Sequence, residues 1–599
     1  MNRPQSNLDL AVVGNCEIAA LIDDKASVVW ACLPKLDADP VFCSLLRGEE
    51  TEDSTGIFAI DLRNQTSTKR RYVRNTAILE SLLEDANGNG VRVTDFCPRF
   101  PARGRMHRPM MLIRLLEPVA GRPLVRIRLR PSAVYGSQAP QRSSGSHHVR
   151  FSAPDLSYRL TTDASISAIC GEQWMILDRP RALILGPDQT IEEAPLAMAL
   201  QFLNETRRFW EGWVRGLATP PEWQEAVIRS AITLKLCTFE DTGAVVAALT
   251  TSIPEHAGSG RNWDYRYCWI RDSYFVVQAL NSLGTSRTME DYLHYIDQIV
   301  ARSNGARLQP LFSISGEVEV PERTAPALPG YRGMGPVRVG NHAYLQRQND
   351  VYGAIVLAAA QLFFDERLAN PGDAVLFDRL QRFGELAAKS YEEPDAGPWE
   401  FRGREQPHTF SAVMSWAGCD RLRRVAARLG LQDRKRYWGD LAAAMHERIL
   451  QRAWNEELGA FTSSFDGTDL DATALLMPEL GFLPGNDPKF ISTLGAIERD
   501  LKEGDWLYRY RHHDDFGKPA TAFTICAFWY VNALAAAGRR EEARDHFERL
   551  LGCRNSLGLL SEDIEPGTSE LWGNFPQTYS LVGIINCAVR LSRRWEDIL

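Results

Sequence analysis

The hydrophobic pattern of the chain changes its period once, near residue 215, and this change constrains the fold more than any other feature. Before it, apolar and polar residues alternate, as where Val125, Ile127 and Leu129 are separated by arginines. Such alternation is typical of a β-strand with one face in solvent. After about residue 221, apolar residues recur every three or four positions, which is the period of a helix. The pattern predicts a β-rich part followed by an α-helical part.

The β-rich part, residues 1–215, is expected to form an antiparallel β-sandwich. Its predicted strands are short and are separated by Gly, Pro, Asn and Ser. The stretch AALIDDKASVVWACLP is typical of a hairpin that turns at Asp23 and Asp24. Many short strands with frequent turn residues indicate two packed sheets.

The helical part, residues 216–599, contains about twelve predicted helices and no repeat of fixed length. Helices of ordinary length joined by long loops favour a closed barrel of paired helices over a coiled bundle or a repeat array. The predicted helices are 222–239, 272–283, 288–302, 349–366, 373–390, 411–429, 433–452, 470–477, 486–499, 520–537, 540–551 and 577–591.

Composition excludes several classes of protein. The 599 residues carry a formal net charge of −8, with a pI near 5.9, so no nucleic-acid or membrane partner is expected. The short basic run KRRYVR, residues 69–74, is interpreted as a solvated strand edge. The start of the chain lacks the apolar core of a signal peptide, and no stretch is long and apolar enough to span a membrane. A cytoplasmic location is the default expectation, and the sequence leaves a homo-oligomer open.

The eleven cysteines are scattered without a CxxC pair, which is typical of buried free thiols in a reducing compartment. No metal or organic cofactor is expected. The run HHDD, residues 512–515, resembles a set of metal ligands, but neighbouring side chains in an extended loop diverge, so a solvated or hydroxyl-binding loop is favoured.

Two acidic positions in the long loops could carry chemistry. Trp399 and Glu400 stand together in GPWEFRG, and an indole beside a carboxyl group favours the protonated form that a general acid needs. Glu562 begins the acidic run of LLSEDIEPG, where a carboxylate could activate water. The alternatives are a solvated loop residue for Glu400 and an acidic turn for Glu562. Glycoside cleavage needs two such groups, one protonated and one ionised.

The stretch RNWDYRYCWIRDS, residues 261–273, crowds aromatic rings and charges at the start of a predicted helix. It is expected to lie extended and to place Tyr265, Tyr267 and Trp269 along one wall of a cleft. Asp272 could cap the helix or reach into that cleft. Stacking faces and paired polar groups are what carbohydrate sites need.

Taken together, these motifs resemble glycoside hydrolase family 15, the glucoamylase-like and bacterial trehalase-like enzymes. The resemblance covers nearly the whole chain and rests on RNWDYRYCWIRDS, GYRGMGPVRVGN, NDVYG, GPWEFRG, LYRYR and LLSEDIEPGTSELWGNFPQTYS, in that order. It implies an N-terminal β-sandwich on an (α/α)6 barrel. It also implies inverting hydrolysis of α-glucosidic bonds from the non-reducing end, without a cofactor.

The resemblance also assigns roles to residues. Glu400 would be the general acid and Glu562 the general base. The residues expected to bind the sugar are Tyr265, Trp269, Arg271, Asp272, Trp399 and Arg509.

The chain departs from the family pattern where the second part of the substrate would bind. Leu581 stands where many relatives have histidine, and His512 and His513 interrupt the usual spacing from Arg509 to an acid. KPATAF, residues 518–523, stands where relatives often have an acid. These departures leave the substrate open. The loop 34–39 could bring Lys35 or Asp37 to the site, although a domain-interface role is favoured.

The main functional hypothesis is an exo-acting hydrolase that releases glucose from maltooligosaccharides, isomaltooligosaccharides or a related glucan. The alternative is a trehalase with the same acid and base. A phosphorylase is disfavoured because it needs no base carboxylate, and retention of both glutamates disfavours an inactive sugar-binding protein.

Overall fold

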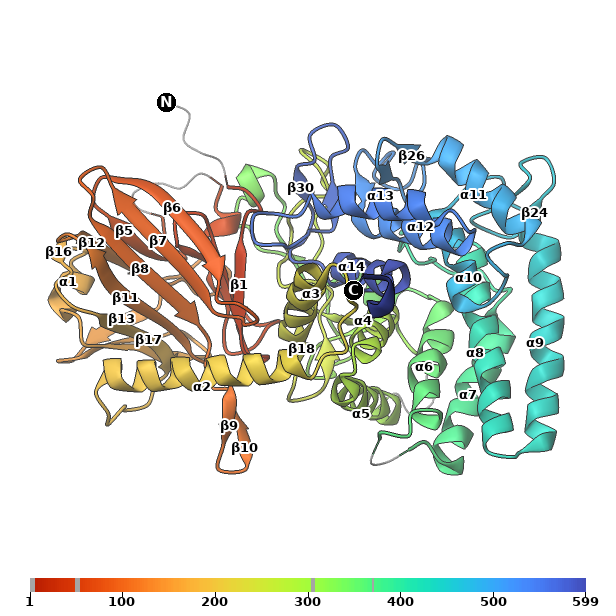
Figure 1. The fold of residues 1–599 in the computed structure, drawn as a ribbon, viewed down its shortest axis with the longest axis horizontal. Helices are drawn as coiled ribbons and strands as arrows, with labels where there is room; N and C mark the ends of the chain where they lie inside the picture. Colours follow the sequence, from red (N-terminus) through yellow and green to blue (C-terminus); the bar gives the residue numbers. More distant parts are fainter. Residues whose placement is uncertain (1–5, 49–53, 303–306, 369–370, 599) are drawn as a thin grey trace.

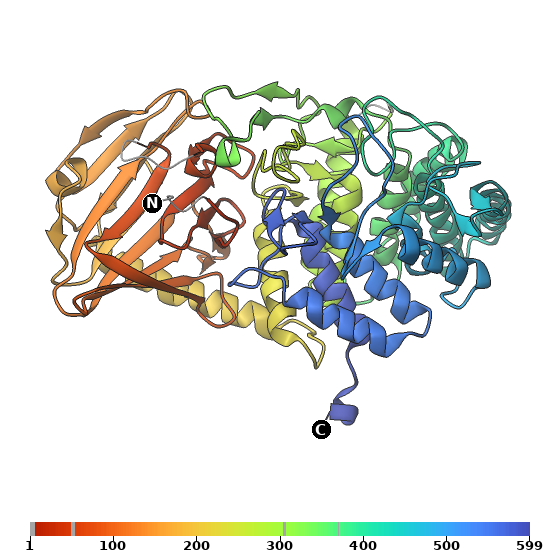
Figure 2. The ribbon, with the colours of Figure 1, turned by 90° about the horizontal axis from the view of Figure 1, so that it is seen from above.

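The computed structural model describes residues 6–48, 54–302, 307–368 and 371–598. An antiparallel sheet domain is followed by a helical domain, as Figures 1 and 2 show. The predicted fold class is therefore confirmed.

The N-terminal domain is a sandwich of two sheets whose strands all pair antiparallel. Val13 and Ile60 of one sheet share a buried core with Val93 and Leu185 of the other. In spatial order, the first sheet consists of β1 (Ala11–Gly14), β2 (Ala19–Ile22), β3 (Val28–Cys32), β5 (Ile57–Leu62), β12 (Leu124–Arg130) and β16 (Met175–Ile176), with β4 (Pro40–Phe42) paired to β3. The second consists of β13 (Gln141–Ser144), β14 (His148–Ser152), β15 (Ser157–Thr162), β17 (Arg181–Pro187), β11 (Leu112–Ala120), β8 (Gly90–Phe96), β7 (Leu79–Asp85) and β6 (Gln65–Tyr72).

Local sequence signals of this domain are confirmed. On β12, Val125, Ile127 and Leu129 are buried, while the arginines between them reach the outer face. The hairpin between β2 and β3 turns at Asp23, whose carboxylate accepts hydrogen bonds from the backbone N–H groups of Lys25 and Ser27. An aspartate that bonds the backbone two residues on stabilises such a turn.

One long helix in this region was not predicted. α2 (Pro195–Arg215) contacts β17, β11 and β9 (Phe100–Ala102) and runs along the sandwich in Figure 1. It buries a narrow stripe that includes Thr206, Trp210 and Val214. Because most of its other positions are polar, the apolar signal was too sparse to reveal the helix from sequence alone.

The helical domain is a closed ring of paired helices. Its inner members contact one another in sequence, α4 with α6, α6 with α8, α8 with η5 and α10, η5 with α12, and α12 with α14, and α14 closes on α4. Each inner member packs on an outer one: α4 on α5, α6 on α7, α8 on α9, η5 on α11, α12 on α13 and α14 on α3. Within the described residues, these twelve positions agree with the twelve predicted segments.

The inner helices are buried on every side. Every residue of α6 is buried, because such a helix touches its ring neighbours and its outer partner at once. The inner members are α4 (Ile270–Ser282), α6 (Asp350–Ala360), α8 (Thr409–Arg428), η5 with α10 (Ala472–Leu480), α12 (Thr524–Ala536) and α14 (Thr578–Leu591). The outer members are α3 (Gln224–Leu236), α5 (Ser286–Arg302), α7 (Ala374–Ser390), α9 (Gln432–Ala453), α11 (Pro488–Asp500) and α13 (Arg540–Leu551).

The two domains share a continuous apolar core that contains Leu10, Leu21 and Trp30 of the sandwich together with the barrel helices. The indole N–H of Trp30 donates to the carbonyl of Leu249, 2.8 Å away. In the loop 34–39, Lys35 donates to the hydroxyl of Ser315 at 2.7 Å. This contact places the loop at the domain interface, in agreement with the favoured interpretation.

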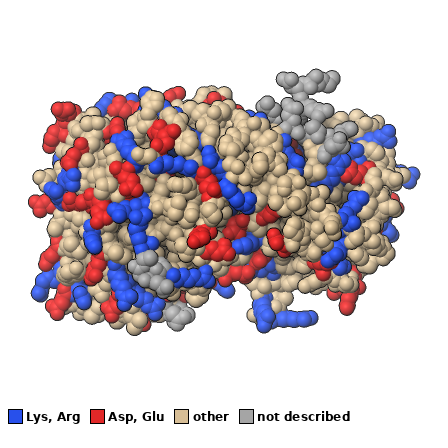
Figure 3. Space-filling view, turned by 180° about the vertical axis from the view of Figure 1, so that it is seen from behind, with Lys and Arg blue, Asp and Glu red and all other residues tan. Residues whose placement is uncertain are grey.

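Acidic and basic side chains are interspersed on the face seen in Figure 3. No helix among the described residues is long and apolar enough to cross a membrane. All eleven cysteines carry free thiols.

Candidate active site

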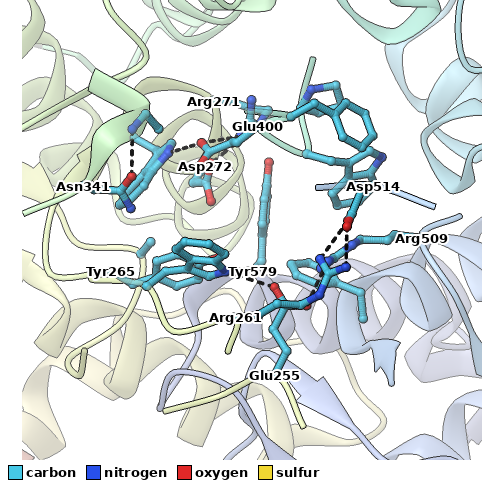
Figure 4. Close-up of a pocket in the computed structure, with 18 of the residues that line it drawn as sticks. Glu255, Arg261, Tyr265, Arg271, Asp272, Asn341, Glu400, Arg509, Asp514 and Tyr579 are labelled. Carbon is cyan, nitrogen blue, oxygen red and sulfur yellow. Dashed lines mark hydrogen bonds and ion pairs between the residues drawn. The ribbon is translucent and has the colours of Figure 1, made fainter. Parts of the chain in front are cut away.

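A cavity at the ring of helices gathers most of the predicted site residues (Figure 4). The predicted residues on its lining are Tyr265, Trp269, Arg271, Asp272, Trp399, Glu400 and Arg509. Glu562 is not part of the lining, but it contacts Tyr265, which lines the cavity. Neither Lys35 nor Asp37 lines the cavity.

Glu400 stands in the loop between α7 and α8 with a strained backbone. Its φ angle is 63°, a left-handed value that is costly for a side chain with a Cβ. Its carboxylate Oε1 accepts hydrogen bonds from the Trp269 indole at 2.6 Å and from the Gln348 amide at 3.2 Å. An Arg271 guanidinium nitrogen lies 3.8 Å from the same oxygen. The loop therefore holds one carboxyl group at a fixed position on the cavity wall.

Glu562 lies just before β29 (Asp563–Ile564) and is fully buried. Its Oε1 accepts a hydrogen bond of 2.6 Å from the Tyr265 hydroxyl. Burial, and secondly the charge of Glu255, raise the pKa of Glu562 to about 8, while the Tyr265 hydroxyl and the Arg509 guanidinium oppose the rise. The pKa of the adjacent Asp563 is also raised, chiefly by burial. The tyrosine and the arginine therefore favour the ionised form of Glu562.

A glycine gives Glu562 its space. Gly573 has a φ of +74°, and a Cβ built there would lie 2.7 Å from the Cβ of Glu562 and 2.8 Å from its Oε2. Any side chain would therefore displace the carboxyl group.

The segment 261–273 connects the two carboxyl groups. The rings of Tyr265 and Trp269 meet edge to face, with centroids 5.4 Å apart, and each donates one hydrogen bond, to Glu562 and to Glu400 respectively. The expectation that Tyr267 shares this wall is wrong. Tyr267 is absent from the cavity lining and packs, just before the short strand β20 (Cys268–Trp269), in a small apolar cluster that includes Trp269 and Leu311.

The opposite face of this segment binds the sandwich domain. Arg266 and Asp264 form an ion pair of 2.7 Å in which both side chains are fully buried. Arg266 also donates to the carbonyl of Ala38 at 2.7 Å and to the Tyr135 hydroxyl at 3.2 Å. The N-terminal domain thus helps to position the segment that holds both carboxyl groups.

Arg271 and Asp272 lie in the first turn of α4. The guanidinium of Arg271 donates to Gln348 at 2.8 Å and to Asp350 at 3.2 Å. The N-cap residue of α4 is Trp269, whose side chain does not cap the helix, and Asp272, three residues further on, lines the cavity. Its Oδ2 is buried without a hydrogen-bond partner, and burial raises its pKa to about 7. This oxygen lies 3.5 Å from the Nε of Arg271, with which it forms an ion pair, and it can accept a hydrogen bond from a ligand hydroxyl in the cavity.

A second group of charges lies across the cavity from Arg271, Asp272 and Glu400 (Figure 4). Arg261 forms a two-pronged ion pair with Asp514, at 2.8 and 2.5 Å. Glu255 accepts hydrogen bonds from Arg509 at 2.8 Å and from Trp263 at 3.1 Å. All four charged side chains of this group line the cavity. Two polar poles therefore face one enclosed space.

Several of these residues were not predicted as ligands. Glu255 occupies a stretch without a local motif, Arg261 opens the motif RNWDYRYCWIRDS but was not assigned a role, and Tyr579 lies in the apolar helix α14, yet all three line the cavity. Only the fold brings them to the site. For Tyr579, the one available signal was its place in the family-like stretch FPQTYS.

Three further positions from the sequence analysis are placed by the structure. Trp399 lines the cavity, and its indole donates to Asp471 at 2.7 Å, which fixes the ring beside Glu400. His512 stacks on Tyr510 with ring centroids 4.3 Å apart and does not line the cavity. Leu581 is fully buried in the helical core.

Within the described part of the chain, no group of three or more His, Cys, Asp or Glu side chains is arranged to hold a metal ion. The chemistry available at the cavity is that of paired carboxyl groups, arginines and aromatic faces.

A sandwich on a ring of paired helices, with two carboxyl groups held by aromatic donors, provides the paired acids that glycoside cleavage needs. The model of "Glycosyl hydrolases family 15" matches residues 222–589, and that of "Trehalase-like, N-terminal" matches residues 5–155. The chain belongs to glycosyl hydrolase family 15, and the predicted resemblance is confirmed.

Similar proteins extend over both domains. A Trehalase of Thermoplasma volcanium is 30% identical over 97% of this chain and 92% of its own. Trehalases of Mycobacterium tuberculosis and Mycolicibacterium smegmatis are 32% and 33% identical, over 98% of this chain and 90% and 92% of theirs. The structure of a bacterial glucoamylase complexed with acarbose matches with a TM-score of 0.68 at 13% identity, over 99% of this chain and 96% of that one.

Proposed function

We propose that this enzyme hydrolyses α,α-trehalose to two glucose molecules. The observation that carries the proposal is full-length similarity: relatives named Trehalase align over more than nine-tenths of this chain and nine-tenths or more of their own. The main hypothesis from the sequence, a glucoamylase-like enzyme on longer glucans, has less support. It rests on the fold it shares with a glucoamylase at 13% identity.

The two polar poles of the cavity suit a disaccharide. In this proposal Arg271 and Asp272 hold hydroxyls of the glucose that is attacked. Arg261 and Asp514 face the second glucose from the other pole. Trehalose joins two anomeric carbons, so its second subsite needs to accept one glucose and little more. Paired buried charges reject a ligand that lacks the matching hydroxyls, because they would lose hydrogen bonds.

Hydrolysis needs an acid and a base on opposite sides of the bond. We assign Glu400 as the general acid that protonates the glycosidic oxygen. Glu562 is assigned as the general base that removes a proton from the attacking water. One-step attack inverts the anomeric carbon and releases one β-glucose and one α-glucose. Trp269 and Tyr265 hold the two carboxyl groups through the hydrogen bonds described above.

A glucose-release assay on trehalose, maltose and isomaltose tests the proposal. The enzyme is expected to cleave trehalose with the highest kcat/KM and to form equal initial amounts of α- and β-glucose. A preference for maltose or isomaltose would restore the glucoamylase hypothesis. Formation of glucose 1-phosphate in place of one of the two glucose molecules when phosphate is present would indicate a phosphorylase. Binding of sugar without turnover would indicate an inactive receptor.

A further inference from the structure

A second cavity lies between the two domains and shares no residue with the active-site cavity. It has a volume of about 750 Å³. Its walls come from the end of β6 and the following turn, from the first turns of α3, and from the segment 551–558 after α13. This segment leads directly to Glu562, and the cavity has no role in the proposed hydrolysis.

The lining of this junction cavity is strongly basic. It contains Arg70, Arg71, Arg74, Arg229 and Arg554. The single acidic residue on the lining is Glu225, which is exposed. The first two are paired: Arg70 with Asp9 at 2.6 Å, and Arg71 with Glu80 at 2.8 Å. Across the residues that the structure describes, the other three arginines have no carboxylate within ion-pair distance. The basic run 69–74 does lie on an edge strand, as expected, but part of it faces this cavity.

Arg229 is the most informative of the three because it is buried, with only 9% of its surface exposed. Its Nη2 donates to the carbonyl of Thr76 at 2.9 Å, and its guanidinium stacks over the ring of Tyr72, 3.5 Å from the ring centre. Its Nη1 has no hydrogen-bond partner. A buried cationic donor without an acceptor is costly, so an acceptor supplied by a ligand would satisfy it.

Arg554 brings a second guanidinium to the same place. A Cβ built on Gly558 would lie 3.4 Å from the Cγ of Arg229 and 3.6 Å from the Nη1 of Arg554, so both side chains flank this glycine. Helix α3 begins at this cavity without a side-chain cap, and the exposed Glu225 in its first turn is the one negative charge on the lining that opposes the arginines there. An uncapped helix N-terminus favours an anion.

We propose that this junction cavity binds a small molecule through a phosphate group, held by Arg229, Arg554 and Arg74. Guanidinium groups match the oxygens of phosphate in geometry and charge. A volume of about 750 Å³ exceeds what phosphate alone would fill, so a phosphate ester of a metabolite is the expected occupant. Tyr72 and Gln224 on the lining would contact the rest of the molecule.

Calorimetric titration of the full-length enzyme tests this proposal at constant ionic strength. One arm uses inorganic phosphate, the other glucose 6-phosphate, and chloride is the reference. Binding of either phosphate compound is expected, and tighter binding of the ester would identify the ester as the class of ligand. No binding in either arm would overturn the proposal.

Variants locate the site. Arg554→Gln and Arg74→Gln are each expected to weaken binding by about tenfold or more, because a charge-assisted hydrogen bond is lost. Arg74 is exposed, so its replacement leaves the core intact. Arg434→Gln, at an exposed arginine of α9, is the matched control and should bind like the unmodified enzyme. Unchanged affinity in both test variants would refute the assignment.

Discussion

Replacing Tyr265 by phenylalanine removes one hydroxyl from the site, and the structure predicts how the pH dependence responds. The hydroxyl donates to Glu562 over 2.6 Å and lowers the pKa of that carboxyl. A hydrogen bond to a charged group contributes about 1.5–3 kcal/mol, and one pKa unit corresponds to about 1.4 kcal/mol. The pKa of Glu562 should therefore rise by about one to two units in Tyr265→Phe.

The direction of the effect on activity follows from the role of the base. Glu562 must be ionised to accept a proton, so activity is lost as the pH falls through its pKa. A higher pKa moves the acid limb of the kcat/KM profile to higher pH by the same one to two units. At pH values well below the acid limb, kcat/KM of Tyr265→Phe should be about 10- to 100-fold lower than that of the unmodified enzyme.

The measurement is kcat/KM for trehalose across both limbs of the profile, since this quantity reports the pKa values of the free enzyme. Tyr267→Phe is the matched control, because this neighbouring tyrosine does not line the cavity. Loss of activity with an unmoved acid limb would refute the reasoning, since the hydroxyl would then act on the sugar and not on the base.

Four other substitutions have expected outcomes. Glu255→Gln removes a charge that raises the pKa of Glu562, so the acid limb should move down by about one pH unit; a limb that moves up or stays in place would contradict this. Asp272→Asn should raise KM and lower kcat, because the Asp272 carboxylate is expected to bind a sugar hydroxyl more tightly in the transition state, and an unchanged kcat/KM would remove it from the subsite. Glu400→Gln and Glu562→Gln should each lower turnover by several orders of magnitude in a folded protein. Glu562→Gln should also raise Tm, by about 2 °C or more. This gain should grow as the pH rises toward about 8, since only the ionised carboxylate is costly to bury. A gain in Tm confined to acidic pH would contradict this.

The periodic parts of the fold could be predicted from the sequence because burial imposes the period. Inner barrel helices such as α6 and α12 are buried over nearly their whole length, and long apolar segments reveal them. The sandwich strand β12 alternates for the same reason. Helix α2 lacks this signal, because it lies on the surface of the sandwich and buries only a thin stripe.

The candidate site was predictable only where a motif concentrates its residues. Glu400 follows a tryptophan between glycines, and Arg271 follows a run of aromatic rings, so both stand out locally. Glu255 comes from a loop without such a pattern, and although Arg261 opens the aromatic motif, only closure of the ring brings these two residues to Arg509 and Asp514. Contacts that only the tertiary fold creates cannot be recognised from the local sequence.

The buried pair of Arg266 and Asp264 shows how the sandwich domain contributes to the site. A fully buried ion pair is weak evidence for stability, because apolar residues of similar volume often stabilise a core equally well. The ion pair instead positions the segment, since the Arg266 guanidinium also donates to Ala38 and Tyr135 and fixes the segment against the sandwich. The opposite face of that segment carries Tyr265 and Trp269, the donors to Glu562 and Glu400. The positions of the two carboxyl groups therefore depend on a contact between the two domains.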